Sequence, residues 1–153
     1  MKRLCVSACL LGVPCRWKGD AKPCKAIVDL DRGDAAVEIV PFCPELAAGL
    51  GCPRPPIELV ADAAPGAPVR VLRVDRRGDA TDALRAACEA EAAELARTGG
   101  VDGFILKSRS PSCGLASPLH DEAGRETGTA PGLWAEIARE RFPDADFRDE
   151  TAV

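Results

Sequence analysis

The sequence predicts an α/β fold, a single domain over residues 1–153 built as a three-layer α/β/α sandwich around a mainly parallel, Rossmann-like sheet. Three observations predict it. Apolar runs of strand length alternate with helical patterns, which is typical of a parallel sheet covered by helices on both faces. Three of these runs are followed by a cysteine at or within a turn. The chain is also long enough to bury a core without disulfides, so its eight cysteines need another explanation.

The chain opens on a strand over residues 2–8, an apolar run that ends where glycine and proline begin a loop over 10–19. Cys5 lies within this strand and is predicted to point into the core. A helix is predicted over 23–30, because proline suits the first turn of a helix and the apolar residues there fall on one side.

A second strand covers residues 37–42 and runs into a helical turn over 44–48. That turn would aim backbone N–H groups at whatever Cys43 binds. Three prolines within 52–56 remove backbone donors and exclude regular structure. This stretch is therefore predicted to be a rigid loop that forms one wall of a site.

Two strand-like runs, 58–62 and 69–75, are separated by a turn rich in proline, glycine and alanine. An alternative to the parallel arrangement places this hairpin at the edge of a mixed sheet. The clearest helix covers 79–97, where apolar residues share one stripe and two glycines end the pattern. Cys88 lies on that stripe and is predicted to be a core residue.

The last predicted strand covers residues 101–107 and delivers Cys113 through a turn of serines, a proline and a glycine. Residues 115–130 are polar and are predicted to form a loop, with His120 in solvent. A proline then opens a final helix over 131–141, whose apolar residues face inward.

Composition excludes several classes of function. The formal net charge is −4, with 20 basic and 24 acidic residues spread along the chain, so duplex nucleic acid is not an expected partner. No apolar run approaches membrane-spanning length and no signal-peptide pattern is seen, so no membrane partner is expected. We expect a cytoplasmic protein whose thiols stay reduced. No feature specifies an oligomeric state.

The three cysteines that follow strands are Cys9, Cys43 and Cys113. Ligands of open parallel sheets bind outside the carboxyl ends of the strands, so these thiols are predicted to converge on one crevice. The alternative is that all three are small apolar residues that end buried strands.

Convergent thiolates indicate a metal. A four-iron cluster normally takes four cysteines, so three would leave one iron open, and an open iron is a soft Lewis acid that suits a sulfur ligand. Zinc is the competing metal, although the chain has no Cys-x-x-Cys pair. Cys15 and Cys52 lie in loops that could supply a fourth ligand.

Three ordered motifs carry a family resemblance over residues 1 to about 115. The motifs are Cys9-Leu10-Leu11-Gly12 with Cys15-Arg16 and Gly19, Phe42-Cys43-Pro44-Glu45 followed by Pro53-Arg54-Pro55-Pro56, and Leu106-Lys107-Ser108-Arg109-Ser110-Pro111-Ser112-Cys113-Gly114. Together they resemble the family, long known only as a domain of unknown function, that includes the iron–sulfur thiouracil desulfidases.

The resemblance implies a 4Fe-4S cluster on Cys9, Cys43 and Cys113 in an α/β fold. It implies non-redox, hydrolytic removal of sulfur from a small thiolated pyrimidine, such as 2-thiouracil or its nucleoside, with the sulfur captured by the open iron and released as hydrosulfide. Glu45 is implied as the catalytic base and Ser110 as a proton relay. The alternative function is a non-catalytic iron–sulfur or zinc module with a redox or structural role.

Several nearby residues are candidate substrate contacts. Ser112, Arg16 and Lys107 could bind substrate, and cations here could also balance the charge of a thiolate cluster, as could Arg54 and Arg109. The alternatives are solvated cations and serines that cap the turn.

The family pattern is not matched everywhere. Where relatives commonly read Arg-Tyr-Asp-Gly, this chain has Arg16-Trp17-Lys18-Gly19, and Ala47-Ala48 stand where relatives commonly have glycines. Trp17 could stack on a pyrimidine ring or pack under its own loop. These departures bear on the identity of the substrate more than on the cluster.

Overall fold

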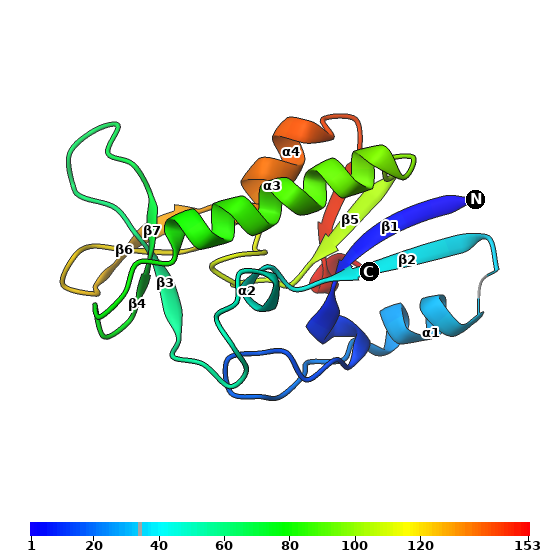
Figure 1. Ribbon diagram of the computed structural model, residues 1–153, viewed down its shortest axis with the longest axis horizontal. Coiled ribbons are helices and arrows are strands. Elements are labelled where there is room, and N and C mark those ends of the chain that lie inside the picture. The colour runs from blue at the N-terminus through cyan, green and yellow to red at the C-terminus, as the bar shows by residue number, and fades with distance from the viewer. Residues whose placement is uncertain (34) are drawn as a thin grey trace.

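The computed structural model describes residues 1–33 and 35–153 and has the predicted α/β architecture (Figure 1). Its first sheet is four-stranded and parallel, in the order β2-β1-β5-β8. The strands of this sheet are β1 (Lys2–Ser7), β2 (Val37–Phe42), β5 (Gly103–Leu106) and β8 (Asp146–Asp149). The three strands that precede the motif cysteines, β2, β1 and β5, are immediate neighbours.

Helices cover both faces of the parallel sheet, as predicted. Helix α1 (Lys25–Gly33) lies on one face, and α3 (Thr81–Arg97) and α4 (Leu133–Arg141) lie on the other (Figure 1). Leu4 and Val6 of β1 pack in the cluster that includes α1, whereas Cys5 between them packs in the cluster of α3 and α4. Side chains of a strand alternate between faces, so each face of this strand contributes to a separate core.

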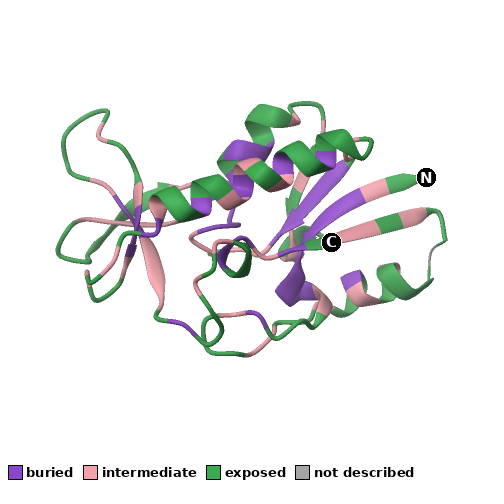
Figure 2. Ribbon diagram, in the orientation of Figure 1, coloured by how far each residue is buried: buried purple, intermediate pink, exposed green. Residues whose placement is uncertain are grey.

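The larger core lies beneath α3 and α4. The Trp134 ring meets Phe42 and Phe104 edge-on, with ring centroids 5.0 and 5.8 Å apart. Cys5 and Cys88 are fully buried, which confirms that both are core residues. Figure 2 shows the buried residues gathered along β1, β5 and the helices that cover them. This packing supports β2 and β5 close to where their cysteine motifs begin.

A second, mixed sheet lies beyond the carboxyl ends of the parallel strands, in the order β4-β3-β6-β7 (Figure 1). Its strands are β3 (Ile57–Val60), β4 (Arg70–Arg73), β6 (Ser117–His120) and β7 (Glu126–Ala130). The predicted hairpin is present as the antiparallel pair β3 and β4, with β4 at an edge. β4 is therefore an edge strand of the second sheet and not of the parallel sheet.

The prediction of a loop over 115–130 is wrong, because β6 and β7 form within it. Their polar sequence lacks an alternating strand pattern, because most of β7 is exposed. β6 pairs antiparallel with β7 and parallel with β3. His120 is also not free in solvent. It is half-buried in β6, with Nδ1 3.2 Å from the Leu59 carbonyl oxygen and 3.3 Å from Glu58 Oε2.

Three short elements complete the fold beside the parallel sheet. They are η1 (Ala8–Leu11), α2 (Pro44–Ala47) and η2 (Glu150–Ala152). The predicted helices at 23–30, 44–48, 79–97 and 131–141 correspond to α1, α2, α3 and α4 with ends shifted by up to three residues. Within the described part of the chain, no helix combines the length and apolar character needed to cross a membrane.

Candidate functional site

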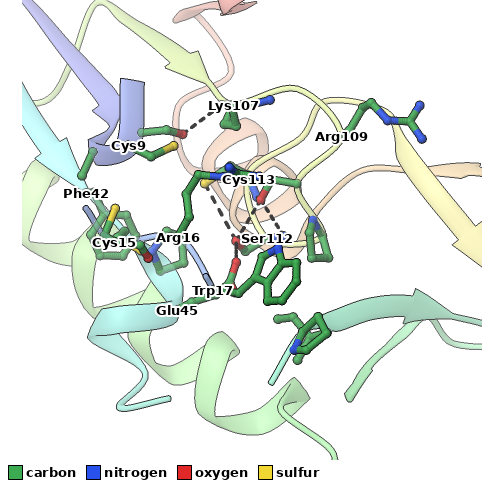
Figure 3. Close-up of a pocket in the computed structure, with 18 of the residues that line it drawn as sticks. Cys9, Cys15, Arg16, Trp17, Phe42, Glu45, Lys107, Arg109, Ser112 and Cys113 are labelled. Carbon is green, nitrogen blue, oxygen red and sulfur yellow. Dashed lines mark hydrogen bonds between the residues drawn. The ribbon is translucent and has the colours of Figure 1, made fainter. Parts of the chain in front are cut away.

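The three motif cysteines line one cavity of about 400 Å³ at the carboxyl ends of the parallel strands (Figure 3). Cys9 lies in η1 directly after β1, Cys43 follows β2, and Cys113 lies in the turn after β5. Because these strands are adjacent and parallel, their carboxyl ends open on the same space. Pro56 and Ile57, at the start of β3, also line this cavity.

Cys9 and Cys113 are buried thiols, with 7% and 5% of their surface exposed. Burial raises the pKa of Cys9 to about 11, although the nearby ammonium of Lys107 acts in the opposite direction. Burial also raises the pKa of Cys113 above its usual range, while a hydrogen bond from the Ser7 hydroxyl favours the thiolate. Both residues would need a bound cation to remain thiolates at neutral pH.

Cys43 has a different environment from the other two. Interaction with the Cys15 side chain lowers the pKa of Cys43 to about 6, although burial opposes the shift, and Cys43 Sγ also lies 3.8 Å from the Cys15 carbonyl oxygen. The backbone N–H of Leu46 in α2 donates to the same sulfur, as expected for a helical turn aimed at Cys43. The thiolate form of Cys43 is therefore stabilised by two interactions within the protein itself.

The two loop cysteines differ in position. Cys15 is 2% exposed, lines the cavity and is the fourth thiol around it. Cys52 is exposed, and among the described residues it stands outside the lining, with Sγ 3.2 Å from the Pro14 carbonyl oxygen and 3.4 Å from that of Arg16. The structure thus brings Cys15, and not Cys52, to the motif cysteines.

A buried polar chain enters the cavity from α2. Glu45 Oε1 accepts a hydrogen bond from Arg54 Nε at 3.0 Å, and Glu45 Oε2 accepts one from Ser112 Oγ at 2.7 Å. All three residues are at most 9% exposed. A second donor of the guanidinium binds the Gly51 carbonyl oxygen at 2.9 Å. Both carboxylate oxygens of Glu45 are thus fixed by donors in a nearly dry environment.

Ser110 lies at the other end of this chain. Its Oγ is 3.2 Å from Ser112 Oγ and accepts hydrogen bonds from the backbone N–H groups of Cys113, at 3.0 Å, and Ser112, at 3.3 Å. Ser110 therefore caps the turn that presents Cys113, and the same hydroxyl can donate to Ser112. Ser110 is thus linked to Ser112, and Ser112 in turn to Glu45, so both serines belong to one hydrogen-bonded chain.

Helix α4 supports the serine turn from behind. The backbone N–H of Trp134 donates to the Ser112 carbonyl oxygen at 2.8 Å, and the backbone N–H of Gly132 donates to the Gly114 carbonyl oxygen at 2.8 Å. A Cβ atom on Gly132 would stand 2.6 Å from the Ser112 carbonyl oxygen, so only glycine permits this approach. The turn is consequently held by the packed core.

Among the described residues, four cations line the cavity, and three of them have ion pairs with described acids. Arg54 pairs with Glu45, Arg16 Nη1 lies 2.9 Å from Asp20, and Lys107 Nζ lies 3.0 Å from Glu150. Arg109 is exposed, in a left-handed conformation with φ of 62°.

Sequence reasoning missed Glu150. Besides Lys107, its carboxylate accepts hydrogen bonds from Ser108 N at 2.7 Å and Ser108 Oγ at 2.9 Å. A polar residue near the chain end gives no sequence signal for this contact. Glu150 fixes the start of the loop that carries the serine turn.

The donor set fits a multinuclear cluster. Within residues 1–33 and 35–153, no three His, Cys, Asp or Glu side chains are placed to hold one metal ion together. An iron–sulfur cluster has a different requirement, because each thiolate binds a different iron and the ligands therefore surround a volume. Three thiols from adjacent strands around one cavity meet that requirement, and thiolates are the ligands that iron–sulfur clusters prefer.

Comparisons with known proteins agree with the motifs. The family described as 2-thiouracil desulfurase matches residues 4–150. The uncharacterized protein YbbK of Bacillus subtilis (strain 168) is 30% identical over 140 residues, which cover 88% of each chain. Among solved structures, the 4Fe-4S-dependent thiouracil desulfidase TudS has a TM-score of 0.75 and 25% sequence identity, over 100% of this chain and 93% of that chain.

Proposed function

Since this chain belongs to the 2-thiouracil desulfurase family, we propose that it hydrolyses a thiolated pyrimidine, without redox chemistry and with the help of a 4Fe-4S cluster. Family membership confirms the resemblance carried by the three cysteine motifs. The observation that carries the proposal is the cavity at the ends of β2, β1 and β5, which joins three thiols to the Glu45 carboxylate. A set of thiols that can bind a cluster, with the buried carboxylate of Glu45 beside it, is more typical of a catalytic site than of an electron carrier.

Cys9, Cys43 and Cys113 would hold the cluster. When bound by three cysteines, a four-iron cluster supplies one open iron, a soft Lewis acid suited to a thiocarbonyl sulfur. We assign Cys15 a contact with Cys43 and no place in the ligand set, because only the three motif cysteines follow the adjacent parallel strands. The dependence of TudS on a 4Fe-4S cluster supports the choice of cluster.

Glu45 is the proposed general base. Hydrolysis forms a bond between the water oxygen and the thiocarbonyl carbon and breaks the carbon–sulfur bond, which leaves a carbonyl and hydrosulfide. Water is a weak nucleophile, and a positioned base typically contributes about 10²–10⁴ in rate. Arg54 orients the carboxylate through Glu45 Oε1 and leaves Oε2 to receive the proton.

Ser112 and Ser110 form the proposed path of that proton. Ser112 Oγ donates to Glu45 Oε2, so the same oxygen can accept a hydrogen bond from the Ser110 hydroxyl. A water bound to Ser110 would replace the long contact of 3.3 Å from the Ser112 N–H, and its proton can then pass from Ser110 to Ser112 and on to Glu45. Ser110 is the more exposed of the two serines and is the one that solvent reaches more readily. This path gives Ser110 the relay role and Ser112 a connecting role.

Arg16 and Lys107 are proposed to donate hydrogen bonds to the acceptor atoms of the thiolated pyrimidine. Their pairing with Asp20 and Glu150 fixes both side chains along the cavity, so little conformational freedom is lost when they donate to a substrate. Both cations also offset the negative charge of a thiolate-bound cluster. We place the reaction in the cytoplasm, where free thiols persist.

Anaerobic reconstitution with iron and sulfide, followed by incubation with 2-thiouracil without an electron donor, tests the proposal. We expect about four irons and four inorganic sulfides per chain and the release of sulfide with uracil over many turnovers. Stoichiometric zinc without inorganic sulfide would instead indicate a zinc module. A cluster with a reversible redox couple but no sulfide release would indicate an electron carrier, and either result would refute the proposed function.

A further inference from the structure

Trp17 is an exposed aromatic residue on the wall of the cavity. Its relative exposure is 39%, whereas Trp134, the other tryptophan, is 1% exposed in the core. A large aromatic side chain contributes most to stability when its ring is covered. An exposed indole on the wall of a cavity is therefore a candidate for contact with a ligand. Figure 3 places this indole among the lining side chains, on the side of the cavity that holds Glu45 and Ser112.

The loop under Trp17 is fixed before any ligand binds. The Arg54 N–H donates to the Trp17 carbonyl oxygen at 2.9 Å, and the Arg16 N–H donates to that of Asp20 at 3.0 Å. The turn closes at Gly19, where φ is +84° and a side chain would be strained. Arg54 also binds the Glu45 carboxylate, so one residue positions both the indole loop and the proposed base.

The ring has a cation against one face. Lys18 Nζ lies 5.3 Å from the centroid of the Trp17 ring, in the range of a cation–π contact. This contact restrains the indole from the side of its own loop, while the ring still lines the cavity. A planar, restrained and partly uncovered ring is suited to stacking on a flat heteroaromatic ligand.

We propose that Trp17 determines specificity by stacking on the pyrimidine ring of the substrate, an inference that rests on the proposed function. Stacking recognises a flat heteroaromatic ring and contacts none of the reacting atoms. It therefore contributes equally to the ground state and the transition state, which lowers KM without changing kcat. Base–aromatic stacking of the usual strength corresponds to a change of about 5- to 150-fold in affinity.

Two substitutions separate stacking from loop packing. Trp17→Leu keeps an apolar side chain but removes the aromatic face, and Trp17→Phe restores a smaller face. We expect Trp17→Leu to raise KM for 2-thiouracil by about 5- to 150-fold with kcat within a fewfold of the parent, and Trp17→Phe to recover most of the loss. Val13→Ala is the matched control, since Val13 is 40% exposed in the same loop and should leave KM unchanged.

Binding of uracil to the reconstituted proteins, measured by calorimetry, gives a readout that needs no turnover. We expect Trp17→Leu to bind uracil about 5- to 150-fold more weakly than the parent and Val13→Ala to bind as the parent does. Near-ultraviolet circular dichroism of the buried Trp134 confirms that each variant is folded.

The outcomes distinguish the inference from the proposed function. A parent that releases sulfide but binds uracil no more tightly than Trp17→Leu overturns the stacking role and leaves the function standing. A parent that binds uracil through Trp17 but releases no sulfide overturns the function and leaves the stacking role standing. A fall in kcat with unchanged KM in Trp17→Leu also overturns stacking.

Discussion

Replacing Glu45 by glutamine removes the proposed base with little change of shape. The glutamine carbonyl oxygen can still accept the hydrogen bond from Arg54 Nε, but its amide nitrogen then faces Ser112 Oγ as a donor. The Ser112 hydroxyl therefore loses its acceptor and the side chain can no longer take a proton. We expect turnover to fall by about 10²–10⁴, which corresponds to about 2.7–5.4 kcal/mol of activation free energy.

The same substitution also removes the counter-ion of a buried cation. The side chains of Arg54 and Glu45 are 3% and 12% exposed, and breaking such a pair typically costs about 3–5 kcal/mol of stability. The amide retains one hydrogen bond to the guanidinium, so we expect a loss of about 1–3 kcal/mol in the free energy of unfolding. Activity must therefore be compared per cluster, well below the melting temperature.

Glu58→Gln is the matched control for this experiment. Glu58 has a side chain 13% exposed, pairs with Arg76 at 2.7 Å and lies in the second sheet, outside the cavity lining. It should lose stability as Glu45→Gln does and keep parental turnover. Sulfide release per cluster by Glu45→Gln within a fewfold of the parent would refute the assignment of Glu45 as the base.

Three further predictions test the rest of the site. Alanine in place of any of the three proposed ligands should abolish cluster absorbance after reconstitution, whereas Cys88→Ala, a change in the core, should retain it. Ser112→Ala should lower sulfide release by about tenfold or more, because it interrupts the proton path. Ser110→Ala should lower sulfide release in the same way. It should also lower the free energy of unfolding by about 1 kcal/mol, because two backbone N–H groups lose their acceptor. Burial opposes ionisation of Glu150, but donors from Ser108 and Lys107 hold its pKa below the usual value. Its carboxylate thus stabilises the fold above the ordinary glutamate pKa, and this contribution disappears as pH falls through the lowered pKa. The melting temperature of the parent should therefore exceed that of Glu150→Gln at neutral pH, and the difference should vanish in acid. A difference in melting temperature that does not change with pH would contradict this.

The convergence of the cysteines was predictable because it depends on local pattern and one rule of topology. Apolar runs followed at a turn by Cys9, Cys43 or Cys113 indicate strands, and parallel strands place their carboxyl ends at one edge. The two strands within 115–130 were not predictable in this way. β7 buries almost nothing, and β6 pairs not only with β7 but also with β3, a partner distant in sequence. β8 was also missed, because its short sequence is mostly charged and only Phe147 packs inward.

The polar contacts of the site depend on long-range geometry that sequence patterns do not encode. Ser112 and Glu45 meet across 67 positions of the chain, and Ser108 and Glu150 across 42. A motif of serines around a proline identifies a turn, but only the turn's three-dimensional path decides which hydroxyl reaches the carboxylate. The family resemblance implied Ser110 as a proton relay, and in the structure Ser112 is the serine that bonds Glu45 directly.

Hydrolysis of 2-thiouracil in heavy-oxygen water tests the central claim most directly. The reconstituted protein is kept anaerobic, without an electron donor, and sulfide is quantified while uracil is analysed by mass spectrometry. We expect equal amounts of sulfide and uracil, with an oxygen atom from the solvent in each uracil formed. Sulfide release that requires a reductant, or uracil that carries no solvent oxygen, would contradict non-redox hydrolysis at this site.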